Sequence, residues 1–389
     1  MSNGKFLELV ESIDGSQASI QRLFNRGADG VGVRKAARWP TYGADLKEAV
    51  KFIGETFDGK RSLWQLKEAL STSDFPLLFG DTIDRLMVAK YQAIVPNWRK
   101  FLKVSKVRDF RAVKRFKCTR GGPLLDELGP GEDYQADAPS EAYYEFLVHK
   151  YGKRRDLLWE ALVNDDLGAL QDAPDDLAWM AANTEHYIAS SQYVANATLY
   201  AASGGGRPTN GNKGTSALSL ESLETAITQV ALFMDEGGMP ILNAPKYLVI
   251  PPALKLAAKK ILTSVSLSFT GVAEASHPTV NVIAGELEIV VDEMIPILDP
   301  TNGQTSWYLF GDPGNGWAAE VGFLTGHETP ELFMKASNQM ALGGGMTAAI
   351  DGDFDTDAVA YKVRHVVGGS HANAVGGWRF SYFSDGTMS

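Results

Sequence analysis

The sequence predicts an α+β protein, in which helical and strand-like patterns occupy different parts of the chain. Helical spacing dominates the first hundred residues, and one long amphipathic pattern covers residues 172–200. Short apolar runs typical of strands follow between residues 247 and 367. We therefore expect a helical N-terminal arm, one long central helix and a mixed helix-and-sheet C-terminal half.

Composition narrows the class of protein. The 389 residues are 44% hydrophobic and 22% charged, which excludes wholesale disorder and fits two or three domains. The single cysteine, Cys118, excludes an internal disulfide and favours a reducing compartment. No apolar run reaches the ~18 residues of a membrane span, and the N-terminus lacks a signal-peptide pattern. These features predict a soluble, unexported chain.

The charge is divided along the chain. Residues 1–120 hold 23 Lys and Arg against 13 Asp and Glu, whereas residues 121–239 hold 6 against 19 and residues 240–389 hold 8 against 15. A basic first third joined to an acidic remainder predicts complementary surfaces, within one molecule or between copies. The alternative is that solvated faces happen to segregate.

The first hundred residues predict several short helices. Apolar side chains recur at helical spacing in two clusters: Leu46, Val50, Ile53 and Phe57, and then Ile83, Leu86, Met87 and Tyr91. Glycine-rich breaks separate these clusters, and none has a substantial core of its own. The segment is therefore expected to be an arm that packs on something else.

Residues 107–119 predict a strongly basic strand, because polar and apolar side chains alternate along them. Glycine and proline break the chain at residues 121–123 and 129–131, and residues 143–148 are apolar enough for a returning strand. Two strands alone bury too little apolar surface to be stable. This excursion is therefore expected to need a partner surface.

The strongest helical pattern comes next. Asp172 is a candidate N-cap and Pro174 suits a first turn, and apolar residues follow at three- and four-residue steps to about Tyr200. Glycines at residues 204–206 end the pattern. The sequence thus predicts one helix over residues 172–200.

The remaining chain mixes helices and strands. Helices are expected at Ser219–Met234, with a capping box weakened by Ser222 in place of Glu, and at Ala253–Leu262. The expected strands are Tyr247–Ile250, Val280–Ile283, Leu287–Val291, Trp307–Phe310, Val321–Leu324 and Val359–Val367.

Two loops look like ligand sites but have the wrong spacing. In residues 206–215, Lys213 does not directly follow the second glycine as a phosphate loop requires, so we expect a flexible inter-domain loop. The acidic run 351–357 alternates carboxylates as an EF-hand does, but Thr356 and Lys362 replace the required Gly and Glu. An acidic loop before a strand is the better interpretation.

No residue pattern predicts a catalytic, cofactor or metal site. No histidine pair has metal-ligand spacing, and Cys118 has no local catalytic signature. The histidines are His149, His186, His277, His327, His365 and His371. The basic stretch from Lys100 to Lys117 is compatible with nucleic-acid contact, but its acidic surroundings favour docking to protein. Together these features favour an assembly subunit over an enzyme.

Several segments resemble tailed-bacteriophage major capsid proteins of the Hong Kong 97-type fold, most closely the major head subunit of Mu-like phages. The segments are Thr72–Gly80, Gly131–Tyr134, His149–Lys153, Leu162–Gly168 and Ala181–Glu185. The stretch Asn164–Leu167 is the most specific of them, and the resemblance spans residues 65–389.

The resemblance implies a role for each region of the chain. Residues 1–106 would be the N-terminal arm and residues 107–160 an extended loop lying over a neighbouring subunit. A peripheral domain would comprise residues 161–215 and 346–389, with its spine helix at 172–200 and a long returning strand at 357–375. Residues 216–345 would form the axial domain around the capsomer axes.

The resemblance also implies the function. Such proteins self-assemble as pentamers and hexamers into an icosahedral shell around double-stranded DNA, first in the host cytoplasm and finally in the virion. Scaffolding, portal and decoration proteins would be further partners, DNA contact would be non-specific, and neither a membrane nor a cofactor is implied. The chain shows no coiled-coil scaffolding segment, fused protease or cross-linking signature.

Two alternatives remain open at this stage. An encapsulin-type compartment shell shares the fold but would package a cargo enzyme. A soluble α/β enzyme with dispersed active-site residues belongs to a different class, and a small fixed oligomer would favour it.

Overall fold

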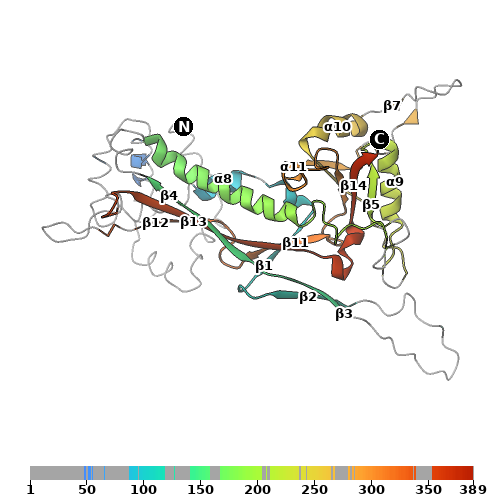
Figure 1. Ribbon diagram of the computed structural model, residues 1–389, viewed down its shortest axis with the longest axis horizontal. Coiled ribbons are helices and arrows are strands. Elements are labelled where there is room, and N and C mark those ends of the chain that lie inside the picture. The colour runs from blue at the N-terminus through green and yellow to red at the C-terminus, as the bar shows by residue number, and fades with distance from the viewer. Residues whose placement is uncertain are drawn as a thin grey trace. The chain divides into compact units, whose positions relative to one another are not determined.

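The computed structural model in Figure 1 combines helices and sheets, as the sequence predicts for the α+β class. It describes residues 48–49, 51–53, 55, 65, 87–94, 96–118, 127, 141–157, 167–203, 207, 211–235, 238–241, 243–263, 266–267, 279–280, 283, 285–335, 337–338 and 353–388. Most of the expected N-terminal arm lies outside these residues, although residues 87–93 form a helix as predicted.

The chain forms two compact units. Unit 1 consists of Met1–Val95, His149–Glu185 and Leu324–Val367, and unit 2 of Pro96–Val148, His186–Phe323 and Gly368–Ser389. Each unit therefore joins segments that are far apart in the sequence.

Unit 1 is built on antiparallel strands. Strand β13 (Val359–His371) pairs through residues 359–367 with β4 (His149–Leu157), and through residues 361–364 with β12 (Glu331–Met334). Helix α8 (Leu167–Ser191) runs along β4 and β13 in Figure 1. The core of this unit joins the helix at residues 87–93, α8 and β13 through Met87, Val88, Tyr91, Leu177, Ala178, Ala181, Ala182, Val359, Tyr361 and Val363.

Helix α8 corrects the predicted span of 172–200. It begins at Leu167, so Asp172 is not its N-cap and Pro174 lies in its interior. Pro174 cannot donate a backbone hydrogen bond, but the helix that follows it is stabilised because Leu177, Ala178 and Ala181 pack in the core of unit 1.

The helix also ends earlier than predicted, at Ser191. Ala195 adopts a left-handed conformation with φ of 47°. The Asn196 side chain then accepts hydrogen bonds from the backbone N–H groups of Thr198 (3.0 Å) and Leu199 (3.2 Å). This local bonding replaces a further helical turn, which the apolar spacing alone does not reveal.

Unit 2 contains a five-stranded sheet with the order β5-β14-β10-β6-β9. The strands are β5 (Lys213–Ser216), β14 (Ser381–Met388), β10 (Trp307–Phe310), β6 (Tyr247–Ile250) and β9 (Glu288–Val291). Strands β6 and β10 lie at the predicted residues, and all eight of their side chains are buried. Continuous apolar runs of this length are typical of central strands.

Helices flank this sheet. Helix α9 (Leu220–Ala231) contacts β14, and α10 (Lys255–Thr263), preceded by the 3-10 helix η2 (Pro252–Leu254), contacts β9. The predicted capping box is complete: the backbone N–H of Ser222 donates to Ser219 Oγ (3.1 Å), and that of Ser219 donates to Ser222 Oγ (2.9 Å). Serine therefore does here what glutamate usually does.

An aromatic cluster joins strand β10 of this sheet to residues from elsewhere in unit 2. Phe101, Tyr193, Tyr308 and Phe310 make successive ring contacts with centroids 4.6–5.4 Å apart. The smaller elements of unit 2 are η1 (Asn97–Lys100), β7 (Ser266–Leu267), β8 (Thr279–Val280), α11 (Ile295–Leu298), η4 (Asn373–Val375) and η5 (Gly377–Phe380). Asn281 and Val282, part of an expected strand, lie outside the described residues.

Residues 107–119, predicted as one strand, contain the last residue of one strand, a bend at residues 108–111 and a second strand. Strand β1 (Lys103–Val107) lies beside β11 (Ala319–Leu324), and β2 (Val113–Cys118) pairs with β3 (Glu141–Phe146). Between β1 and β2, Asp109 Oδ1 accepts a hydrogen bond from the Arg111 backbone N–H (3.2 Å). Such an aspartate turn interrupts a strand even where the alternation of side chains continues.

Candidate functional site

The β2–β3 hairpin has two different faces. The antiparallel register places Arg115 opposite Tyr144, and Phe116 opposite Tyr143. Because directly opposed residues point to the same side of a sheet, Arg115 and Tyr144 share one face and Phe116 and Tyr143 share the other. The Tyr144 side is buried, whereas the Phe116 side is exposed.

The buried face is anchored by one carboxylate. Glu320 on β11 is fully buried and accepts hydrogen bonds from the Arg115 guanidinium (Nε 3.2 Å, Nη2 3.1 Å) and from the Tyr144 hydroxyl. Trp317 Nε1 donates in turn to the Tyr144 hydroxyl (3.0 Å). Burial, together with the bond to Glu320, raises the pKa of Tyr144 above its ordinary range, so the phenol remains a donor.

Lys103 completes this anchor. Its ammonium group lies 3.2 Å from the centroid of the Trp317 ring, a cation–π contact. Burial lowers the pKa of Lys103, while the charge of Glu320 acts in the opposite direction. Contacts from β1, β2 and β3 thus converge on Trp317 and Glu320, at the start of β11, and these residues supply a partner surface for the hairpin.

The exposed face combines aromatic rings with positive charge. Phe116 and Tyr143 are 61% and 47% exposed, and their ring centroids lie 5.5 Å apart. The Lys114 ammonium lies 4.8 Å from the Tyr143 ring and 3.1 Å from Glu145 Oε1. In the bend before β2, Phe110 is 53% exposed. We call Phe110 and Arg111 of the bend, together with Lys114, Phe116 and Tyr143 of the hairpin, the docking face. Exposed aromatic and basic side chains of this kind are typical of protein–protein interfaces.

Other parts of the basic stretch bind within the chain. Lys100 pairs with Glu288 (2.5 Å), and the Lys117 ammonium donates to the carbonyl of Val375 (3.2 Å). By contrast, Arg108 and Arg111 have no side-chain partner among the described residues. The Lys100–Glu288 pair thus joins a residue of the basic stretch to an acidic residue within unit 2.

Two further buried carboxylates accept several bonds each. In unit 2, Asp292 lies 2.9 Å from His186 Nε2 and accepts from the hydroxyls of Ser190 (2.6 Å) and Tyr193. In unit 1, Glu185 accepts from the Tyr91 hydroxyl and lies 3.4 Å from His365 Nε2. Ser190 thus donates to the carboxylate and not to the histidine, whereas a serine nucleophile needs the histidine as its base. These groups are suited to hold elements together.

The phosphate-loop-like segment serves a structural role where it is described. Asn212 is buried; its Nδ2 donates to the carbonyls of Leu199 (3.0 Å) and Trp378 (3.2 Å), and its Oδ1 accepts from the Ala201 backbone (3.2 Å). The sequence motif does not reveal this role. Residues 204–206 and 208–210, where a flexible loop was expected, lie outside the described part of the chain.

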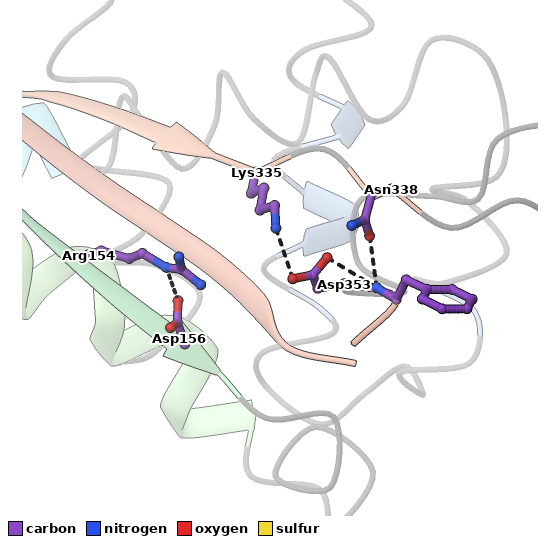
Figure 2. A network of polar contacts seen from close by, with 6 residues as sticks. Arg154, Asp156, Lys335, Asn338 and Asp353 are labelled. Carbon is purple, nitrogen blue, oxygen red and sulfur yellow. Dashed lines mark hydrogen bonds and ion pairs between the residues drawn. The ribbon is translucent and has the colours of Figure 1, made fainter. Parts of the chain in front are cut away.

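The acidic run 351–357 is partly neutralised within unit 1. Figure 2 shows Asp353 accepting a bond from the Lys335 ammonium (2.9 Å), while Asn338 Oδ1 accepts from the Phe354 backbone N–H (2.8 Å). The bond from Lys335 lowers the pKa of Asp353. Within the described residues, no three His, Cys, Asp or Glu side chains are grouped to hold a metal ion.

Two of the described histidines have different surroundings. His327 Nδ1 lies 2.6 Å from Glu331, which also pairs with Arg364 (2.5 Å), and burial lowers the pKa of His371. His277 lies outside the described residues. None of the helices in the described part of the chain is both long and apolar enough to span a membrane.

A family model for phage capsid proteins matches residues 143–380 of this chain. No curated protein matches the sequence. Among solved structures, the chain is similar to the capsid of the cyanophage P-SCSP1u, with 11% identity, a TM-score of 0.43 and coverage of 74% of this chain and 86% of that chain.

Two other solved structures show comparable similarity. For Mycobacterium phage Ogopogo, identity is 13% and the TM-score 0.40, over 73% of this chain and 89% of that one. For a virus-like particle from Pyrococcus furiosus, identity is 13% and the TM-score 0.41, over 79% of this chain and 99% of that one.

Proposed function

Because this chain belongs to the phage capsid protein family, we propose that it is the major head subunit, which self-assembles into an icosahedral shell around double-stranded DNA. The observation that carries the proposal is the family match over residues 143–380, which runs from β3 to η5. Pentamers and hexamers are the proposed building blocks, in the manner of the Hong Kong 97-type fold.

Each region has a proposed role in the shell. Residues 1–106 are the arm, residues 107–160 the extended loop, residues 161–215 with 346–389 the peripheral domain, and residues 216–345 the axial domain. Within the peripheral domain, the proposed spine helix is α8 and the proposed long returning strand is β13.

The docking face is proposed to contact a neighbouring copy. Support comes from the exposed aromatic pair Phe116 and Tyr143, and from Arg111, which has no side-chain partner among the described residues. The Glu320 anchor holds the opposite face of the hairpin, so the docking face is presented in one orientation.

The proposed role is structural, not catalytic. Scaffolding, portal and decoration proteins are proposed as further partners, with non-specific contact to packaged DNA. We propose that assembly takes place in the host cytoplasm and that the mature location is the virion.

Electron microscopy with analysis of the packaged contents tests this proposal. Particles isolated from producing cells are expected to be closed shells that contain nuclease-protected double-stranded DNA. Shells of the same kind that enclose a protein cargo and no DNA would instead indicate an encapsulin-type compartment. A small fixed oligomer with a substrate-dependent thermal shift would contradict both interpretations and favour an enzyme.

The docking face has a separate test. The double variant Arg111→Glu/Lys114→Glu and the variant Phe116→Ala are expected to lower the yield of shells at least about tenfold, because like charges or a missing anchor at an interface weaken association. Their monomers should keep the wild-type Tm, since these side chains are exposed. Lys362→Glu, at an exposed position on β13 and outside the extended loop, is the control and should assemble normally.

Unchanged assembly of the docking-face variants would show that this face does not contact a neighbour. Arg115 is unsuited to this test, because its reversal would break the bond to buried Glu320 and disturb the fold itself.

A further inference from the structure

Two helices of unit 2 carry opposite charges. Helix α9 contains Glu221 and Glu224 and no basic residue, whereas α10 contains Lys255, Lys259 and Lys260 and no acidic residue. All five charged side chains are exposed. None of them has a side-chain partner among the residues that the structure describes.

On each helix two of these charges lie on one stripe. At about 100° per residue, Glu221, Glu224 and Leu232 fall on the side of α9 opposite its buried residues Leu223, Ala226 and Val230. Leu232, which directly follows the helix, is 66% exposed. The outer stripe of α9 therefore combines acidic groups with a large apolar side chain.

The outer stripe of α10 also combines charged groups with a large apolar side chain, but its charge is positive. Lys259 and Lys260 share a side with Leu256, which is 73% exposed, while Ala258 and Leu262 are buried on the other side. Lys255 lies outside this stripe, about 20° around the helix from Leu262. An apolar centre with charged flanks is the usual anatomy of a protein–protein interface.

The stability of the helices does not explain these charges. The helix dipole favours an acidic group in the first turn and a basic group in the last, which accounts for Glu221 and Lys260. Lys259 lies before the last turn of α10, and Glu224 lies beyond the first turn of α9. At these two positions the charge has no local stabilising role.

The sheet keeps the two stripes apart within one unit. Helix α9 contacts β14, next to the β5 edge, and α10 contacts β9, the opposite edge, with β10 and β6 between them. No ion pair joins α9 to α10 among the described residues. Each copy therefore presents both stripes, and a second copy offers the complement of each.

We propose that the acidic stripe of α9 in one copy packs against the basic stripe of α10 in the next, with Leu232 and Leu256 in the apolar centre. Because two different surfaces meet, the contact is heterologous, and such contacts repeat head to tail until a ring closes. The inference rests on the proposed function, since it assigns the chemistry of the contact that builds the rings of the shell.

Charge-swapped variants test this pairing. In Glu221→Lys/Glu224→Lys both stripes become basic, and in Lys259→Glu/Lys260→Glu both become acidic. Each variant alone is expected to form at least about tenfold fewer rings than wild type, because like charges then meet at every contact. An equimolar mixture should restore rings, since each variant complements the other.

The proposed pairing also predicts the ring size that the mixture forms. Two complementary variants satisfy every contact only when they alternate, and alternation closes only in even-membered rings. Native mass spectrometry and negative-stain microscopy of the mixture should therefore show hexamers and a depletion of pentamers relative to wild type.

The control variant is Glu286→Lys/Glu293→Lys. It makes the same charge change as the α9 variant at two exposed residues that flank β9, outside both stripes. It should form rings as wild type does, and circular dichroism should show all variants folded.

Two results would overturn the inference while leaving the proposed function intact. Either charge variant forms rings as well as wild type, or the mixture fails to restore the rings that the single variants lose. If the wild-type chain and its shells never assemble under any condition that supports folding, the proposed function fails and this inference fails with it.

Discussion

Single buried polar side chains hold distant parts of the chain together. Glu320 collects bonds from Arg115, 205 residues earlier in the chain, and from Tyr144, 176 residues earlier. Asn212 links Leu199 to Trp378 in the same way. Nothing local in the sequence marks these residues, because a glutamate among apolar neighbours or an asparagine in a glycine-rich loop is usually exposed. Their roles depend on partners that only the fold brings near.

Replacing Glu320 tests the anchor of the hairpin. Glu320→Ala is expected to lower the free energy of unfolding by about 2–4 kcal/mol, because Arg115 and the Tyr144 hydroxyl lose their buried acceptor. Urea denaturation measures this loss. Glu145→Ala removes the exposed ion pair with Lys114 and should leave stability unchanged. Equal effects of the two substitutions would contradict the anchor.

Asp292 predicts a dependence of stability on pH. Burial raises the pKa of its carboxyl, but bonds from His186, Ser190 and Tyr193 outweigh burial and hold the pKa below the ordinary value of 3.8. A depressed pKa contributes stability that is complete above the unfolded-state value and is lost as the pH falls through the folded-state value. Asp292→Asn should therefore be less stable than wild type near pH 7, with the difference shrinking below about pH 4.

Chemical denaturation at several pH values measures this difference. Asp312→Asn serves as a comparison, since the pKa of Asp312 is also lowered, by its bond from Lys246, but the group is exposed. A gap between wild type and Asp292→Asn that stays constant from pH 7 to acid would show that the ionised carboxylate of Asp292 does not contribute.

At the scale of elements, predictability depends on how much of the structural signal is local. Strands β6 and β10 were predicted at their observed residues because each is a continuous apolar run closed by turn residues. Strands β4, β12 and β14 were not predicted. The run His149–Leu157 of β4 is almost wholly polar, and β14 carries the polar residues Ser381, Ser384 and Asp385, so neither shows a strand pattern.

The capping box of α9 permits a direct test at this scale. Ser219→Ala is expected to lower the free energy of unfolding by about 1 kcal/mol, because the Ser222 backbone N–H loses its acceptor. Thermal and urea denaturation measure the change. Thr225→Ala, on the exposed side of the same helix, should be neutral or slightly stabilising, since alanine is the better helix former. Equal losses would show that the cap is not formed.

At the scale of the whole molecule, the prediction of a phage capsid protein is confirmed by the family match over residues 143–380. The bottom-up features, an arm, a hairpin in need of a surface and no catalytic pattern, pointed only to an assembly subunit. The resemblance of particular segments supplied the family. The domain boundaries stay predictions, because contacts within one chain do not determine which surfaces meet in a shell.

The central claim is that copies of this chain build a closed shell, and the mass of the purified chain in solution tests it most directly. Size-exclusion chromatography with light scattering should give pentamers and hexamers, or megadalton particles, rather than the 42.2 kDa of one chain. A mass that stays at one or two chains at every protein concentration, with scaffolding protein also supplied, would contradict the account.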